Sequence, residues 1–116
     1  MEMSEYQERA RLFYILSHPA RLQILDILRR GEECVCHIQA MLGKRQAYVS
    51  QQLMILREAE LVADRKEGQN VFYRLVELTV DGVLAVVLGP AEARTCCEET
   101  ACPRCHPSEQ LVPEPS

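Results

Sequence analysis

The spacing of apolar residues along the chain predicts a mainly helical fold with one β-hairpin. Apolar positions recur every three to four residues, as on one face of an α-helix, in five segments: 5–17, 19–30, 35–42, 46–59 and 78–88. Pro19 suits the first turn of the second segment, and Gly43 suits the end of the third. Residues 61–66 and 71–76 are rich in Val, Leu, Phe and Tyr and flank a turn that contains Gly68, which predicts a hairpin.

The third and fourth predicted helices form a helix-turn-helix. Only three residues, one of them glycine, join 35–42 to 46–59, and so short a turn is typical of this motif. Val49, Leu53 and Leu56 are spaced i, i+4, i+7 and predict the buried face of the fourth helix. The polar residues on the other side of this helix could form an ordinary solvated face. The hairpin that follows would act as a wing, and its presence favours a DNA-binding role. Small and amide side chains on that side suit a major groove: Gln46, Ala47, Ser50, Gln51 and Met54.

The last predicted helix, 78–88, is apolar around most of its circumference. One small domain could hardly cover such a helix, so the pattern predicts a dimer interface. We expect a homodimeric winged helix-turn-helix fold, mainly α with a small β-hairpin, over residues 1–89. Residues 90–116 show no periodicity and are expected to form a flexible, cysteine-containing C-terminal tail.

The net charge of −4 is unusual for a protein that binds DNA, but its distribution matters more than its sum. The tail 90–116 holds two basic against five acidic side chains. The stretch 42–75 holds six basic against four acidic ones and remains available for phosphates. Charge therefore permits DNA binding without establishing it.

The chain contains six cysteines, and their setting decides their chemistry. No apolar run approaches the roughly 20 residues that span a bilayer, and the N-terminus lacks the pattern of a secretory signal. A cytoplasmic protein with reduced thiols is expected, which favours metal or redox chemistry over a disulfide framework. Cys102 and Cys105 have the spacing of a dithiol redox motif, but no thioredoxin-like strand–helix context surrounds them, so we do not expect an enzyme.

Five stretches between residues 8 and 88 carry recognisable motifs: Leu16–Leu25 (LSHPARLQIL), Glu33–Cys36 (ECVC), Val49–Leu53 (VSQQL), Leu61–Val62 and Arg65–Leu75 (RKEGQNVFYRL). In order and spacing they closely resemble the ArsR/SmtB family of metal-responsive transcriptional repressors. The resemblance implies a homodimer that binds double-stranded operator DNA and leaves it when an inducer binds. Gln51 stands where many relatives carry histidine. The positions implied to meet DNA are Arg45, Gln46, Ala47, Ser50, Gln51, Arg57, Lys66 and Gln69.

The resemblance also implies that the Cys34-Val-Cys36 motif takes part in sensing. Residues i and i+2 of a regular helix point about 200° apart, so both thiols can bind one ion only if the helix start is distorted. Relatives often add a further cysteine, but here Gln39 and Ala40 occupy the positions one turn later, and no cysteine precedes Cys34. The missing thiolates must therefore come from the tail, or the tail forms a site of its own.

We expect As(III) or Sb(III) as inducer, bound by Cys34, Cys36 and a tail cysteine. A site within the tail, formed by Cys96, Cys97 and Cys102, is nearly as well supported. Cd(II), Pb(II) and Zn(II) are alternative ions, because soft sulfur ligands favour soft metals.

These residues are also compatible with two other functions. A redox or persulfide sensor would form a disulfide between the Cys34 or Cys36 thiol and a tail thiol. A structural zinc ion in the tail is a third possibility, with His106 beside Cys105 as a potential ligand. His37 is expected to be a partly exposed side chain more often than a ligand. On the last helix only Asp81 remains of the Asp and His pattern that binds harder ions in relatives.

Overall fold

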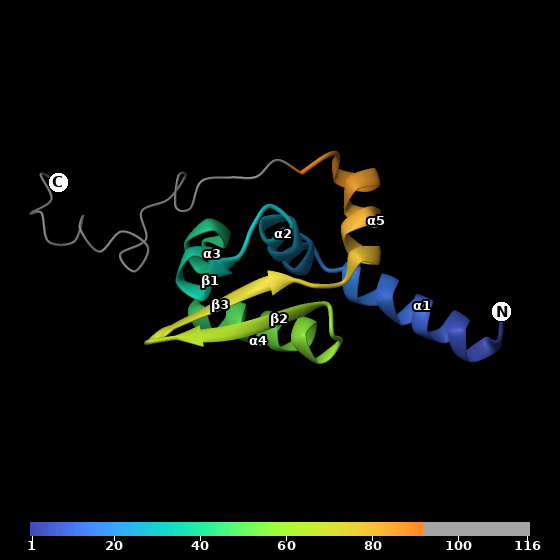
Figure 1. Ribbon diagram of the computed structural model, residues 1–116, viewed down its shortest axis with the longest axis horizontal. Coiled ribbons are helices and arrows are strands. Elements are labelled where there is room, and N and C mark those ends of the chain that lie inside the picture. The colour runs from blue at the N-terminus through green and yellow to red at the C-terminus, as the bar shows by residue number, and fades with distance from the viewer. Residues whose placement is uncertain (92–116) are drawn as a thin grey trace, which may run out of the picture.

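The computed structural model describes residues 1–91 and confirms the mainly helical fold with a wing (Figure 1). Most of the predicted tail, with all four of its cysteines, lies outside the described residues. None of the described helices is long and apolar enough to cross a membrane. In chain order the elements are α1 (Met3–Leu16), α2 (Pro19–Leu28), β1 (Glu33–Cys34), α3 (Val35–Leu42), α4 (Gln46–Glu58), β2 (Val62–Glu67), β3 (Asn70–Leu75) and α5 (Leu78–Leu88).

Local sequence sets the ends of the helices that matter for the site. The backbone N–H of Ala20 donates to His18 Nδ1 at 3.2 Å and caps α2, while Pro19 starts it. Gly43 ends α3 with a φ of +68°, a left-handed conformation that favours glycine. The chain can therefore turn sharply into α4.

The hydrophobic core lies where α2, α3 and α4 meet the sheet. Val49, Leu53 and Leu56 on α4 are fully buried, which confirms the predicted inner face of that helix. Ile24 on α2 and Ile38 on α3 are equally buried and belong to the same cluster. Burying each such side chain contributes about 1.5–3 kcal/mol, so this cluster fixes how α4 sits on the rest of the domain.

The sheet has one strand more than the sequence predicted. β2 and β3 form the expected antiparallel hairpin, with Glu67 opposite Asn70 and a two-residue turn that begins at Gly68, where φ is +62°. The additional strand β1 pairs with the other edge of β3, which gives the order β1-β3-β2. A strand of two residues carries no alternating pattern, so periodicity could not reveal it.

Tyr73 on β3 gives the fold a dependence on alkaline pH. Its side chain is buried, and this burial, followed by the negative charge of Asp64, raises the pKa of its phenol above 10.0. The unfolded chain therefore loses this proton at lower pH than the folded one, and the free energy of unfolding falls as pH rises above about 10. We expect Tyr73→Phe to reduce this fall, measured as urea midpoints at pH 8 and pH 10.5. Tyr14→Phe, at a 74% exposed position, is the control and should keep the wild-type slope.

Helices α1 and α5 lie at the same end of the molecule and leave apolar surface uncovered (Figure 1). α5 turns Val80 and Leu84 into the core, while its other sides face outward. Large apolar side chains stand exposed on both helices: Tyr6, Phe13, Tyr14, Leu78, Val86, Val87 and Leu88. Exposed apolar surface of this extent marks an interaction site.

Candidate nucleic-acid interface and thiol site

Helix α4 presents the side chains predicted to meet DNA on its outer face. Gln46, Ala47 and Gln51 are exposed, and Ser50 is half-buried beside them. Arg45 caps the helix N-terminus in an extended conformation and is also exposed. The positive end of the helix dipole and the Arg45 guanidinium thus lie together, an arrangement that attracts phosphate.

Consecutive glutamines on α4 have different surroundings. Gln51 is exposed, whereas Gln52 is buried and its Oε1 accepts a hydrogen bond from Arg21 Nε at 2.9 Å. Arg21 also donates through Nη1 to the carbonyl of Ile15 at 3.3 Å. Gln52 therefore fastens α4 to α2 and the end of α1, a role that the sequence analysis missed. Its position three residues after buried Val49 was the available signal.

The basic side chains near the wing are engaged to different degrees. Lys66 and Gln69, predicted to meet DNA, are exposed on β2 and in the turn at the hairpin tip. Arg57 donates a hydrogen bond to Asp64 at 3.0 Å and forms an ion pair with that carboxylate. Arg65 is bound to Glu32 and also to a second carboxylate on its own strand. Lys66 is thus the basic side chain that the wing holds toward solvent at its tip.

The two cysteines of the Cys-Val-Cys motif are brought together. Cys34 precedes α3 with an extended backbone (φ −82°, ψ 156°), and Cys36 lies in the first helical turn. Their Sγ atoms are 3.0 Å apart, longer than the roughly 2.05 Å of a disulfide bond, so both are thiols. Because α3 begins only after Cys34, the opposed directions expected within a regular helix do not arise.

An aromatic ring covers one of the thiols, and a buried His–Glu pair flanks the motif in sequence. Phe72 packs against Cys34, whose side chain is 1% exposed, while Cys36 is half-buried. A short hydrogen bond joins His37 Nδ1 to the Glu33 carboxylate, so this pair links β1 to α3 on either side of the motif. The expectation of a partly exposed His37 was wrong, because the imidazole is fully buried against that carboxylate.

Two thiols are too few for a stable metal site. Within residues 1–91, no group of three or more His, Cys, Asp or Glu side chains is placed to hold a metal ion. Any further thiolate ligand must come from residues 92–116 or from a second molecule. The predicted ligands Cys96, Cys97 and Cys102 lie outside the described residues.

Arg29 fastens the end of α5 to the end of α2. Its side chain is 1% exposed and pairs with Asp26 at 2.7 Å, while its Nη1 donates to the carbonyl of Gly89 at 2.7 Å. Gly89 closes α5, so the guanidinium satisfies a carbonyl at the end of a helix, where positive charge is favourable. The chain consequently leaves the domain beside the end of α2. Arg29, which holds it there, precedes Cys34 by five residues. Sequence reasoning did not identify this role of Arg29.

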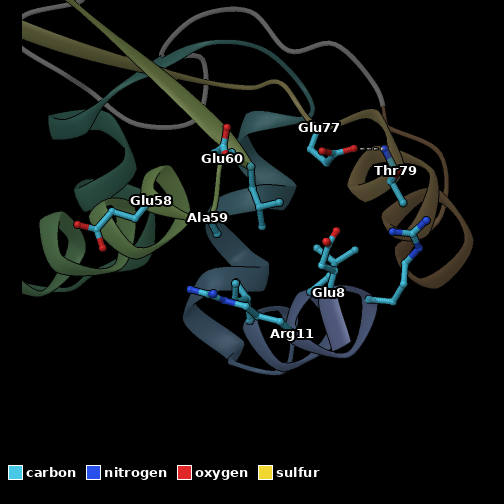
Figure 2. A pocket seen from close by; sticks show the side chains of 11 residues that line it. Glu8, Arg11, Glu58, Ala59, Glu60, Glu77 and Thr79 are labelled. Carbon is cyan, nitrogen blue, oxygen red and sulfur yellow. Dashed lines mark hydrogen bonds between the residues drawn. The ribbon is translucent and has the colours of Figure 1, made fainter. Parts of the chain in front are cut away.

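A separate hollow of about 670 Å³ lies on the α1 and α5 side of the molecule (Figure 2). It is bordered by α1, the end of α4 and the start of α5, where the Thr79 backbone N–H donates to Glu77 at 3.3 Å. Its charged lining is Glu8, Arg9, Arg11, Glu58, Glu60 and Glu77. The hollow shares no lining residue with the thiol pair and borders the helices that expose apolar side chains.

A helix-turn-helix followed by a β-hairpin defines the class of winged helix-turn-helix DNA-binding proteins. Residues 18–64 match the family described as bacterial regulatory protein, arsR family. The chain belongs to this family of DNA-binding transcriptional regulators, which are not enzymes. Membership of this family thus agrees with the resemblance that the Cys-Val-Cys, α4 and wing motifs indicated.

Repressors named for different functions are similar in sequence to this chain. The biofilm growth-associated repressor of Agrobacterium fabrum is 40% identical over 89 residues, covering 73% of this chain and 76% of that protein. The SmtB homologue of Synechocystis is 39% identical over 66% of this chain. The arsenical resistance operon repressor of Escherichia coli is 45% identical over 55% of this chain. The chain matches only 58% and 56% of the length of these last two proteins.

Solved structures share the fold as well. HlyU from Vibrio cholerae superposes with a TM-score of 0.70 and 33% identity, covering 75% of this chain and 94% of that one. The homodimeric winged helix-turn-helix DNA-binding domain of Mb0332 from Mycobacterium bovis gives a TM-score of 0.67 and 33% identity. It covers 73% of this chain and 79% of that one.

Proposed function

We propose that this protein is a repressor that binds operator DNA as a homodimer and leaves it when As(III) or Sb(III) binds cysteine thiolates. The observation that carries the proposal is the convergence of two thiols, 3.0 Å apart, at the start of the helix that precedes α4. A soft ion bound there would act on the helix-turn-helix itself. Because bacterial DNA lies in the cytoplasm, we expect the protein to act there.

The face of α4 supports the DNA-binding part of the proposal. Gln46, Ala47, Ser50 and Gln51 would enter the major groove, where amide and hydroxyl groups reach base edges. Arg45 and Arg57 on α4, together with Lys66 and Gln69 on the wing, would contact phosphates and sugars. Arg57 would do so only by exchanging its partner Asp64 for a phosphate.

The distance between the two thiols is close to the one that a soft ion needs. Two thiolates on one tetrahedral ion stand about 3.7 Å apart when each metal–sulfur bond is about 2.3 Å. The observed 3.0 Å between the Cys34 and Cys36 Sγ atoms needs to open by less than 1 Å. Soft thiolate ligands select soft ions, which include Cd(II), Pb(II) and Zn(II) as well as the metalloids.

The third thiolate is proposed to come from the tail. Arg29 holds Gly89 beside α2, and six residues separate Gly89 from Cys96. An extended segment from Gly89 to Cys96 spans up to about 25 Å, which sets the reach available to Cys96, and Cys97 and Cys102 lie farther along the chain. A site formed by these three cysteines alone is the alternative arrangement.

The dimer is proposed to form through α1 and α5, whose apolar side chains one subunit leaves exposed. The similar domain of Mb0332 is described as homodimeric, which supports this assembly. A two-fold dimer would present two α4 helices to successive turns of the major groove.

A thiol redox or persulfide sensor is the second candidate function. In this candidate the Cys34 or Cys36 thiol would form a disulfide with a tail thiol, and half-buried Cys36 is the more accessible of the two. Under this alternative an oxidant or polysulfide, rather than a metalloid, would release the DNA.

Release of DNA by arsenite tests the proposal. We expect sodium arsenite, in excess phosphine reductant, to release a fluorescent operator duplex selected from random sequence by the protein itself. Cys34→Ser with Cys36→Ser should abolish release under the mixed site and leave it intact under the tail-only site, whereas replacement of Cys96, Cys97 and Cys102 should abolish release under either. Each variant should bind DNA normally without arsenite. Release by an oxidant or polysulfide alone would contradict the metalloid proposal.

A further inference from the structure

The wing is joined to the segment that precedes the thiol motif by one arginine. Arg65 on β2 binds the Glu32 carboxylate with two parallel hydrogen bonds, Nε to Oε2 at 3.0 Å and Nη2 to Oε1 at 2.9 Å. Its Nη1 donates to Glu67 at 3.1 Å. The hydrogen bond from Arg65 lowers the pKa of the Glu32 carboxyl, as expected for a bidentate pair.

The same arginine stacks on the ring that covers a thiol. Its guanidinium carbon lies 4.7 Å from the centroid of the Phe72 ring, within the range of a cation–π contact. Phe72 is opposite Arg65 in the β2–β3 register and opposite Cys34 in the β1–β3 register, and it packs against Cys34. Because Glu32 precedes Cys34 by two residues, these three side-chain contacts and the backbone from Glu32 to Cys34 together form a closed ring through Glu32, Cys34, Phe72 and Arg65.

An ion cannot use the Cys34 thiol without disturbing this ring. The side chain is 1% exposed, and Phe72 and Cys36 pack against it, so sharing its Sγ with a third thiolate requires one of these groups or β1 to move; because Cys36 is itself a ligand of the proposed site, we assign the movement to Phe72 or β1. β1 pairs with β3 through only two residues, Glu33 and Cys34, and offers little resistance. Movement of either group would separate Arg65 from Phe72 or from Glu32.

We propose that Arg65 and Phe72 are positioning residues that couple the Cys34–Cys36 pair to the wing. Inducer binding displaces Phe72 from Cys34, loosens the Arg65–Glu32 contact and changes how the hairpin tip lies on DNA. The wing is then an output of the sensor in addition to α4. This inference rests on the proposed function, because it requires an inducer at Cys34 and Cys36.

Two substitutions separate the coupling from simple structural support. Arg65→Lys keeps the charge but loses the planar, bidentate group, and Phe72→Leu keeps an apolar side chain but loses the aromatic face. Arg74→Lys, exposed on the neighbouring strand β3, is the matched control. Arsenite stoichiometry, DNA affinity with and without arsenite, and backbone amide shifts would be measured on the full chain in excess reductant.

We expect both variants to bind arsenite with wild-type stoichiometry but to respond less. The ratio of DNA affinities without and with arsenite should fall by about 2- to 30-fold, the range for residues that modulate coupling between sites. In the wild type and in Arg74→Lys, arsenite should shift the amides of residues 33–38 and also those of residues 66–71. In the two variants, the shifts at 66–71 should shrink.

The outcomes distinguish this inference from the function on which it rests. Arsenite shifts at 33–38 without shifts at 66–71, or wild-type affinity ratios in both variants, would overturn the coupling alone. Release of wild-type DNA without shifts at 33–38 would also overturn it, because the ion would then act elsewhere. If arsenite neither shifts 33–38 nor releases DNA from the wild type, the proposed function fails and the inference fails with it.

Discussion

Replacing Val86 with glutamate is expected to leave the protein monomeric and to abolish tight binding to its operator. Val86 is 86% exposed on α5, on the apolar surface that we propose as the dimer interface. An unpaired charge buried between subunits costs about 3 kcal/mol or more, which corresponds to at least roughly a 100-fold weaker dimer. Each monomer would then offer a single α4 helix to DNA, without the gain from binding two half-sites.

Sedimentation and DNA anisotropy at matched protein concentrations would measure both effects. Val86→Ala keeps the position apolar and is the control; it should remain dimeric with a modest loss of affinity. Circular dichroism should show the same helix content for both variants, because Val86 does not contribute to the core. A dimeric Val86→Glu protein with unchanged affinity would show that α5 is not the interface.

Replacing Gln51 with glutamate is expected to weaken operator binding by about 5- to 150-fold, from roughly 1–3 kcal/mol for a base contact. The two side chains have nearly the same shape, and Gln51 is exposed, so α4 should fold as before. The added negative charge would face the phosphates and base-edge acceptors of the groove. The loss of the amide contact should remain at every salt concentration at which binding is measured, while the repulsion from the added charge should shrink as salt rises.

Gln23→Glu supplies the matched control for this substitution. Gln23 is exposed on α2, so the same change of charge is made away from the proposed DNA-reading face. It should alter operator affinity by less than about threefold, as expected for a distant charge screened by salt. Equal losses from both variants would indicate a general electrostatic effect and would contradict a specific contact by Gln51.

Hydrophobic periodicity was sufficient to predict the helices, the inner face of α4 and the wing. It could not reveal β1, because pairing of Glu33 and Cys34 with β3 depends on a tertiary contact rather than on a local pattern. The same contact explains why the two thiols converge, since the extended strand delays the start of α3 until Val35.

The burial of polar residues could not be predicted from the sequence either. The i, i+4 spacing of Glu33 and His37 permits their pairing, but only the packed structure shows that both are buried. Gln51 and Gln52 are chemically identical, and their different environments follow from the side of α4 that each occupies. The residues that we propose to supply the third thiolate, Cys96, Cys97 or Cys102, lie outside the residues that the structure describes.

The bond between Arg29 and Gly89 has a consequence for sensitivity in a cell. Abundant small thiols compete for any soft ion, so two cysteines acting alone would lose it easily. Because Arg29 fixes Gly89 beside α2, only six residues link this point to Cys96. A short tether of this kind gives an effective concentration of about millimolar order, which would make closure of the proposed three-thiolate site an intramolecular step. Loss of the Arg29 anchor would thus raise the arsenite concentration needed for release without removing any sulfur ligand.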